Sequence, residues 1–106
     1  MSKTTLVELL YFEGCPSWEQ AFENLAKAMR LEGLTVPISK VLVTSTEDAR
    51  RNHFLGSPTI RVDGRDVERP AATGRAFGLT CRLYQDGTHM VVSPSVEMIR
   101  QALQRG

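Results

Sequence analysis

The stretch that decides the fold runs from residue 6 to residue 18 and reads Leu6-Val7-Glu8-Leu9-Leu10-Tyr11-Phe12-Glu13-Gly14-Cys15-Pro16-Ser17-Trp18. Its first seven residues form a nearly continuous apolar run, which is typical of an interior strand covered on both faces. Pro16 marks the start of a helix, because the first helical residue does not need its N–H. The stretch therefore predicts a strand that leads through a cysteine into a helix.

The sequence that follows predicts alternating helices and strands. Apolar residues at spacings of three and four predict a helix over residues 16–33. A strand over residues 36–43 comes next, with a phase slip that either a bulge at Ser39-Lys40 or a start after Pro37 explains. Residues 44–47, Thr-Ser-Thr-Glu, fit a capping box and open a short helix that ends at residue 53 or 54.

Two Asp-Gly pairs predict hairpins. Asp63-Gly64 joins a strand at residues 59–62 to one at 65–67, and a second pair at residues 86–87 joins 79–84 to 89–92. Between them, residues 69–78 form an irregular connection. Ser93-Pro94 is expected to cap a last helix that buries Val96, Ile99 and Leu103. The order is β-α-β-α-β-β, an insertion over 69–92, then α. It predicts one α/β domain over residues 1–106, with a central mixed sheet that helices flank on both faces.

The composition indicates an ordinary globular domain of 106 residues, 42% hydrophobic and 24% charged. The net charge of +1 argues against nucleic acid as a partner, although residues 50–82 hold seven arginines and three acids. No apolar run reaches the ~18 residues of a membrane span, and no signal peptide is visible. We therefore expect a cytoplasmic protein without a membrane partner, and we leave its oligomeric state open.

Cys15 is the leading candidate for chemistry. At a helix start, unpaired N–H groups and the positive end of the helix dipole stabilise a thiolate, the form that attacks disulfides or binds soft metals. The alternative is a small buried side chain without reactivity. Ser57-Pro58-Thr59 is the second candidate, because this tripeptide before a strand can hold a cis peptide bond beside a thiol. Such a bond exposes backbone with which an extended substrate can pair.

Together these features resemble the thioredoxin superfamily over nearly the whole chain. Residues 54–64, with Cys-Arg-Leu-Tyr at 81–84, are similar to small bacterial thioredoxin-like proteins. The resemblance implies a thioredoxin-like fold with a nucleophile at Cys15 and a cis-proline at Pro58. It also implies that the backbone of Ser57 meets the substrate. No cofactor is expected. The candidate substrate-binding residues are Pro16, Trp18, Ser57, Pro58 and Thr59.

The sequence departs from the family at Trp18, which stands where the Cys-x-x-Cys motif has its second cysteine. A mixed disulfide at Cys15 must then be resolved by Cys81 or by an external thiol such as glutathione. If residues 79–84 form a strand, Cys81 shares a face with Leu79 and Leu83, which favours a buried, inert thiol. If the insertion packs over the active end of the sheet instead, Cys81 is a partner for Cys15.

Three functions remain open at this point. The first is a thiol–disulfide oxidoreductase that acts through Cys15 on a protein or glutathione disulfide. The second is a binding protein for Cu(I) or Hg(II), held by the thiolates of Cys15 and Cys81. No metal site with a histidine is expected, because neither His53 nor His89 stands at a metal-ligand spacing from a cysteine. The third is a non-catalytic thioredoxin-fold module that makes protein contacts.

Overall fold

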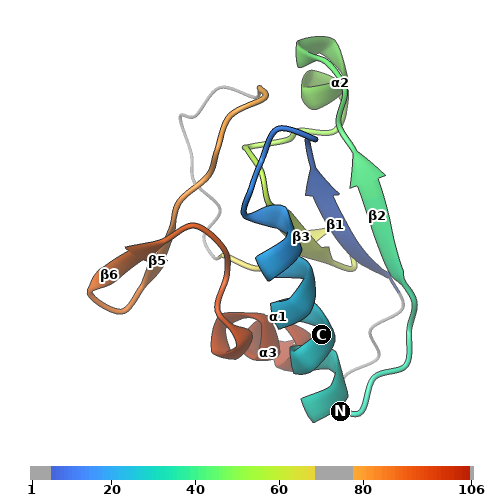
Figure 1. Cartoon of the computed structure of the whole chain (residues 1–106). Coiled ribbons are helices and arrows are strands. Elements are labelled where there is room, and N and C mark those ends of the chain that lie inside the picture. The colour runs from blue at the N-terminus through green and yellow to red at the C-terminus, as the bar shows by residue number, and fades with distance from the viewer. Residues whose placement is uncertain (1–5, 69–77, 106) are drawn as a thin grey trace.

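A four-stranded mixed sheet forms the centre of the computed structural model, which describes residues 6–68 and 78–105 (Figure 1). The strand order is β2-β1-β3-β4. β1 (Val7–Tyr11) pairs in parallel with β2 (Ile38–Leu42) and antiparallel with β3 (Thr59–Val62). The short strand β4 completes the sheet beside β3.

The remaining elements are three helices and three short strands. Their bounds are α1 (Trp18–Leu31), α2 (Thr46–Arg51), α3 (Val96–Arg105), β4 (Arg65–Asp66), β5 (Tyr84–Asp86) and β6 (His89–Val91). β5 and β6 pair antiparallel in a hairpin that projects from one side of the domain, at the left of Figure 1. The mixed α/β class and the order of the elements along the chain agree with the prediction.

The helices α1 and α3 pack together against one face of the sheet, where the main core lies (Figure 1). Val7 and Leu9 of β1 are paired with Val62 and Ile60 of β3 and share this face with them. All four are buried, and they pack with Ala21, Leu25, Ile99 and Leu103 of the helices. The apolar stripe predicted for the first helix therefore faces the sheet, with Leu25 as its buried centre.

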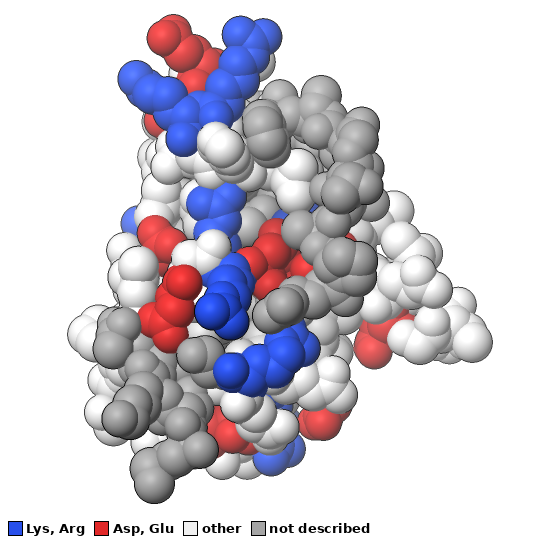
Figure 2. Space-filling view, turned by 180° about the vertical axis from the view of Figure 1, so that it is seen from behind, with Lys and Arg blue, Asp and Glu red and all other residues white. Residues whose placement is uncertain are grey.

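The opposite face of the sheet differs from the prediction. Leu10 on this face packs in a second small cluster with Val43, Ala49 and Phe54, beneath the six-residue helix α2. Glu8, two residues earlier on the same face, is only partly buried. Figure 2, seen from behind, shows basic and acidic side chains interspersed on this side of the molecule. Among the described residues, α2 is therefore the only helix on this face, and it covers one end of it.

Several boundaries shift from their predicted places. α1 begins at Trp18 with Ser17 as its N-cap, so Pro16 precedes the helix and is not its first residue. β2 begins after Pro37, which settles the phase slip without a bulge. The last helix is capped by Ser95, whose hydroxyl accepts from the Met98 N–H at 3.1 Å, and not by Ser93.

The second hairpin is shorter than predicted. Its first strand begins at Tyr84, so residues 79–83 are not part of the hairpin ladder. They run instead past the loop before β3, where a single parallel bridge joins Cys81 to Ser57. The first part of the predicted insertion, residues 69–77, lies outside the described residues. No helix within 6–68 or 78–105 has the length and apolar character that a membrane crossing needs.

Candidate active site

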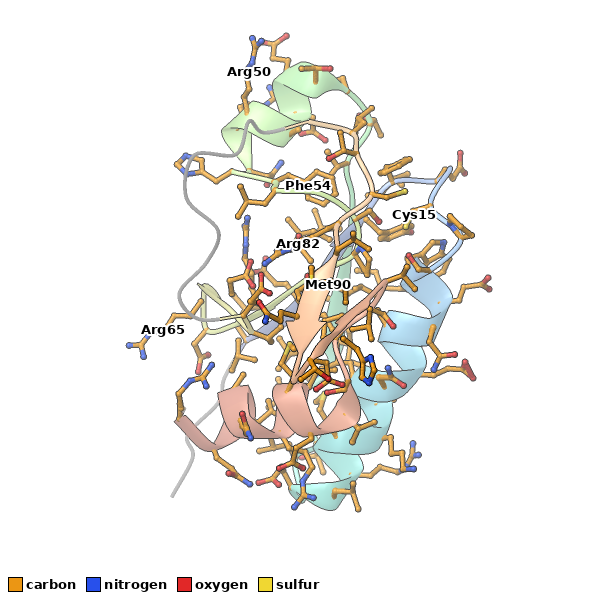
Figure 3. The ribbon with its side chains drawn as sticks, turned by 90° about the vertical axis from the view of Figure 1, so that its left-hand side faces the viewer. Cys15, Arg50, Phe54, Arg65, Arg82 and Met90 are labelled. Atoms are coloured by element: carbon orange, nitrogen blue, oxygen red, sulfur yellow. The ribbon has the colours of Figure 1, made fainter. Side chains whose placement is uncertain are left out.

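Cys15 lies in the turn between β1 and α1, beside the N-terminal end of the helix (Figure 3). Its backbone N–H donates to the carbonyl of Phe12 at 3.1 Å, which fixes the turn. The residue is only 2% exposed, and its Sγ lies 3.2 Å from the hydroxyl oxygen of Ser17. The helix start thus holds a single thiol against polar groups, as the sequence predicts.

The surroundings of Cys15 favour its thiolate. Burial alone raises the pKa of the thiol, because a charge is costly away from water. Hydrogen bonds from the hydroxyls of Ser17 and Ser57, and from the backbone N–H groups of Ser17 and Trp18, outweigh burial. The pKa of Cys15 therefore lies below its ordinary value.

Ser57 lies opposite Cys15 in the loop before β3, and its peptide bond to Pro58 is cis. The side chain is fully buried, and its hydroxyl has no hydrogen-bond partner within the described part of the chain. Its place beside Cys15 allows it to donate to the sulfur when the thiolate forms. Ser57, and with it the cis bond to Pro58, therefore lies beside Cys15.

The backbone of Ser57 is already used within the chain. Its N–H donates to the carbonyl of Thr80 at 2.8 Å, and its carbonyl accepts from the N–H of Arg82 at 3.0 Å. Cys81, between these two residues, is the register partner of Ser57. The backbone edge expected to meet an extended substrate is thus occupied by the segment at 80–82.

Of the two alternatives for Cys81, the one that places it on a buried face of a strand is wrong. Cys81 and Leu83 are exposed, whereas Arg82 and Tyr84 are buried. Burial alternates only from Cys81 to Tyr84, and there its faces are the reverse of those predicted. The reversal has a physical cause: a buried arginine needs anionic partners, and these come from Asp66 and Glu68, far away in the sequence.

Arg82 lies at the centre of a buried ion network (Figure 3). Its guanidinium donates to the two carboxylate oxygens of Asp66 at 2.7 and 2.9 Å and to Glu68 at 3.2 Å. It also lies 4.4 Å from the ring centroid of Tyr84, whose hydroxyl donates to the Pro58 carbonyl. Burial is the main cause that raises the pKa of Tyr84, so the phenol stays protonated and can donate. The network fastens the segment at 80–84 to the loop that holds the cis bond.

Gly56, like Arg82, has a structural role that the sequence did not predict. It has a φ of +130°, and a Cβ there would lie 3.0 Å from both the Arg82 Cβ and the Thr80 carbonyl oxygen. Only glycine therefore lets residues 80–82 come this close to the loop. The available signal was the Gly-Ser-Pro tripeptide, in which a glycine precedes a turn.

The other predicted substrate-binding residues take mainly structural places. The Thr59 hydroxyl is buried, donating to the Gly56 carbonyl at 2.6 Å and accepting from Arg82 at 3.1 Å. The Trp18 ring stacks on Tyr11 with centroids 4.5 Å apart, at the end of the sheet. Pro16 is exposed beside the thiol. Of this group, Pro16 follows Cys15 directly, Trp18 lies three residues after it, and Thr59 is hydrogen-bonded to the loop before β3.

A groove of about 300 Å³ adjoins the loop that leads into Cys15. It is lined by Phe12, Glu13, Gly14, Leu42, Val43, Thr44 and Leu79. The walls are mostly apolar, so the groove suits an apolar group better than a charged one.

No three His, Cys, Asp or Glu side chains gather into a metal-binding group within the described ranges. His53 and His89 are both exposed, the first after α2 and the second in β6. Comparison of the chain with protein-family models, with curated proteins and with solved structures gave no match.

Proposed function

We propose that this protein is a thioredoxin-like thiol–disulfide exchange protein whose nucleophile is Cys15. The observation that carries the proposal is the sulfur environment, in which two serine hydroxyls and two backbone N–H groups lower the pKa of a buried thiol. A buried cysteine with no chemical role needs no such donors, because a neutral thiol packs as a small hydrophobe. The donors have a purpose only if the thiolate is used.

The exchange step follows from ordinary thiol chemistry. The Cys15 thiolate attacks one sulfur of a substrate disulfide, a new S–S bond forms at Cys15, and the old bond breaks with release of a substrate thiolate. The Ser17 and Ser57 hydroxyls hold the sulfur charge until attack. A second thiol then cleaves the mixed disulfide, because Trp18 occupies the place of a local second cysteine.

The topology supports the thioredoxin-like part of the proposal. β1 and β2 are parallel and are joined through α1, and β3 and β4 form an antiparallel hairpin at the other side of β1. The thiol follows β1, and the cis Ser57–Pro58 bond precedes β3. Because β1 and β3 are neighbours, these two features are brought together at the same end of the sheet.

One observation favours a non-catalytic binding module as the second candidate. Both backbone groups of Ser57 are bonded to Thr80 and Arg82, so an extended peptide finds no free edge there. A module of this kind would keep the fold without using the thiol. Its Cys15 would show no enhanced reactivity.

The test is the alkylation rate of Cys15 against pH. Fully reduced Cys81→Ser protein is treated with iodoacetamide, and modification is located by peptide mass spectrometry. We expect an apparent pKa below the ~8.5 of a free thiol. The Cys15→Ser variant is the matched control, because it reports the exposed Cys81 alone. A Cys15 that stays inert, or that titrates like a free thiol, contradicts the proposal and favours the binding module.

A further inference from the structure

Cys81 is brought to the side of Ser57 that faces Cys15. Residues paired across neighbouring strands project their side chains to the same side, with Cα atoms about 4.8 Å apart. Ser57 and Cys81 are such a pair. Cys15 follows β1 and Ser57 precedes β3, so both lie at the same end of the sheet, and the Ser57 hydroxyl is near enough to the Cys15 sulfur to lower its pKa. The register therefore directs the Cys81 side chain to the side of Ser57 on which that sulfur lies.

The neighbour of Cys81 points to the opposite side. The side chain of Arg82 points into the protein, where its guanidinium is fully buried against Asp66 and Glu68. Successive side chains of an extended segment point to opposite sides, so Cys81 points away from this network. Its exposure agrees with that orientation and leaves the thiol open to solvent.

The segment is also held close to the loop before Ser57. Gly56 leaves no room for a Cβ between itself and residues 80–82, and two backbone hydrogen bonds of 2.8 and 3.0 Å clamp Ser57 between Thr80 and Arg82. The position of Cys81 is therefore set by fixed backbone contacts on both of its sides. A thiol held in place in this way reacts as an intramolecular partner and not as a free solute.

We propose that Cys81 is the resolving thiol of Cys15, so that the two cysteines form an internal disulfide during each exchange. This inference rests on the proposed function. After Cys15 has formed a mixed disulfide, the Cys81 thiolate attacks the Cys15 sulfur, the Cys15–Cys81 bond forms, and the second substrate thiolate leaves. The two protein thiols are oxidised, and the substrate disulfide is reduced to two thiols. An external thiol reductant, such as reduced glutathione, then restores both cysteines.

The proposal assigns a role to the segment at 80–82. The segment pairs with the backbone edge of Ser57 and places the Cys81 thiol beside it. Cys81 then does the work of the second cysteine of the Cys-x-x-Cys motif, whose position Trp18 occupies. The occupied edge is then part of the exchange cycle.

The test follows the fate of reduced protein mixed with glutathione disulfide. Samples are quenched with acid, and intact and peptide masses are measured. We expect wild type to lose both thiols and retain no glutathione. The Cys81→Ser protein should accumulate with glutathione bound to Cys15. It should form no internal disulfide. If wild type also stops with glutathione on Cys15, this inference is overturned while the proposed function stands. If Cys15 of the Cys81→Ser protein takes up no glutathione and wild type forms no internal disulfide, both the inference and the proposed function fail.

Gly56→Ala tests the geometry separately. The added Cβ must push residues 80–82 away, so closure of the internal disulfide should slow on the order of tenfold to a hundredfold, with the glutathione adduct accumulating. Gly87→Ala is the control, because Gly87 also has a positive φ but open space around it. Circular dichroism checks that both variants are folded. Closure of a folded Gly56→Ala protein at the wild-type rate overturns the assignment of Cys81 through this register.

Discussion

Asp66→Asn should destabilise the protein strongly, because it removes the main counter-charge of a buried arginine. The Arg82 side chain is 0% exposed and makes two hydrogen bonds to the Asp66 carboxylate, at 2.7 and 2.9 Å. Asparagine keeps the shape, but it removes the charge and turns one acceptor into a donor that faces an Arg82 N–H. The guanidinium would keep Glu68, at 3.2 Å, as its only anionic neighbour in the network.

The magnitude follows from this loss. Removing one partner of a buried ion pair costs about 3–5 kcal/mol, because the other charge is left without compensation. Glu68 remains, so we expect the lower end, about 3 kcal/mol. For a domain near 100 residues this lowers the melting temperature by at least ~12 °C. It is a large part of a typical unfolding free energy of about 5–15 kcal/mol.

Urea unfolding followed by circular dichroism measures the effect. Asp86→Asn is the matched control, since it makes the same chemical change at an exposed carboxylate in β5 and should stay within about 0.5 kcal/mol of wild type. An Asp66→Asn protein as stable as this control would refute the reasoning. It would mean that the Arg82–Asp66 pair does not hold the segment at 80–84 in place.

Three further predictions concern the thiol and the loop beside it. Ser57→Ala removes a hydroxyl that lowers the pKa of Cys15, so alkylation of Cys15 at neutral pH should slow; exposed Ser39→Ala should leave the pH profile unchanged. Folding lowers the pKa of Cys15, so its thiolate stabilises the folded state above the unfolded pKa, and that stability is lost as pH falls through the folded pKa. The unfolding free energy of wild type relative to Cys15→Ser should therefore rise from acidic to mildly alkaline pH; a flat difference in urea titrations would contradict the pKa shift. Tyr84→Phe leaves the buried Pro58 carbonyl without its donor and should cost about 1–3 kcal/mol in urea unfolding, and a neutral effect would show that the bond contributes nothing.

Much of the scaffold around the thiol could be predicted because its signals are local. The apolar run at residues 6–12 and the helical spacing after it place Cys15 between β1 and α1. Asp63-Gly64 marks the β3–β4 turn, where both residues have positive φ values of 51° and 83°. These features depend on neighbours within a few residues, so the sequence alone carries them.

The errors come from long-range contacts. Burial alternates from Cys81 to Tyr84, but a strand over residues 79–84 was expected to place its apolar members inside. Arg82 is buried instead because Asp66 and Glu68 approach it across the fold. Nothing near Arg82 in the chain indicates these partners. Gly56 was missed for the same reason, since the contact that excludes a Cβ there comes from residues 80–82.

The sequence by itself therefore determined a thiol at the start of a helix and a Ser-Pro pair before a hairpin, because periodicity, turn chemistry and the helix dipole act locally. Only the tertiary structure decided that Ser57 lies against Cys15, that Cys81 is its register partner, and that the backbone edge beside the thiol is occupied. These relations join residues more than twenty positions apart. They depend on how β1, β3 and the segment at 80–84 pack together, and on a buried charge whose partners no local pattern can specify.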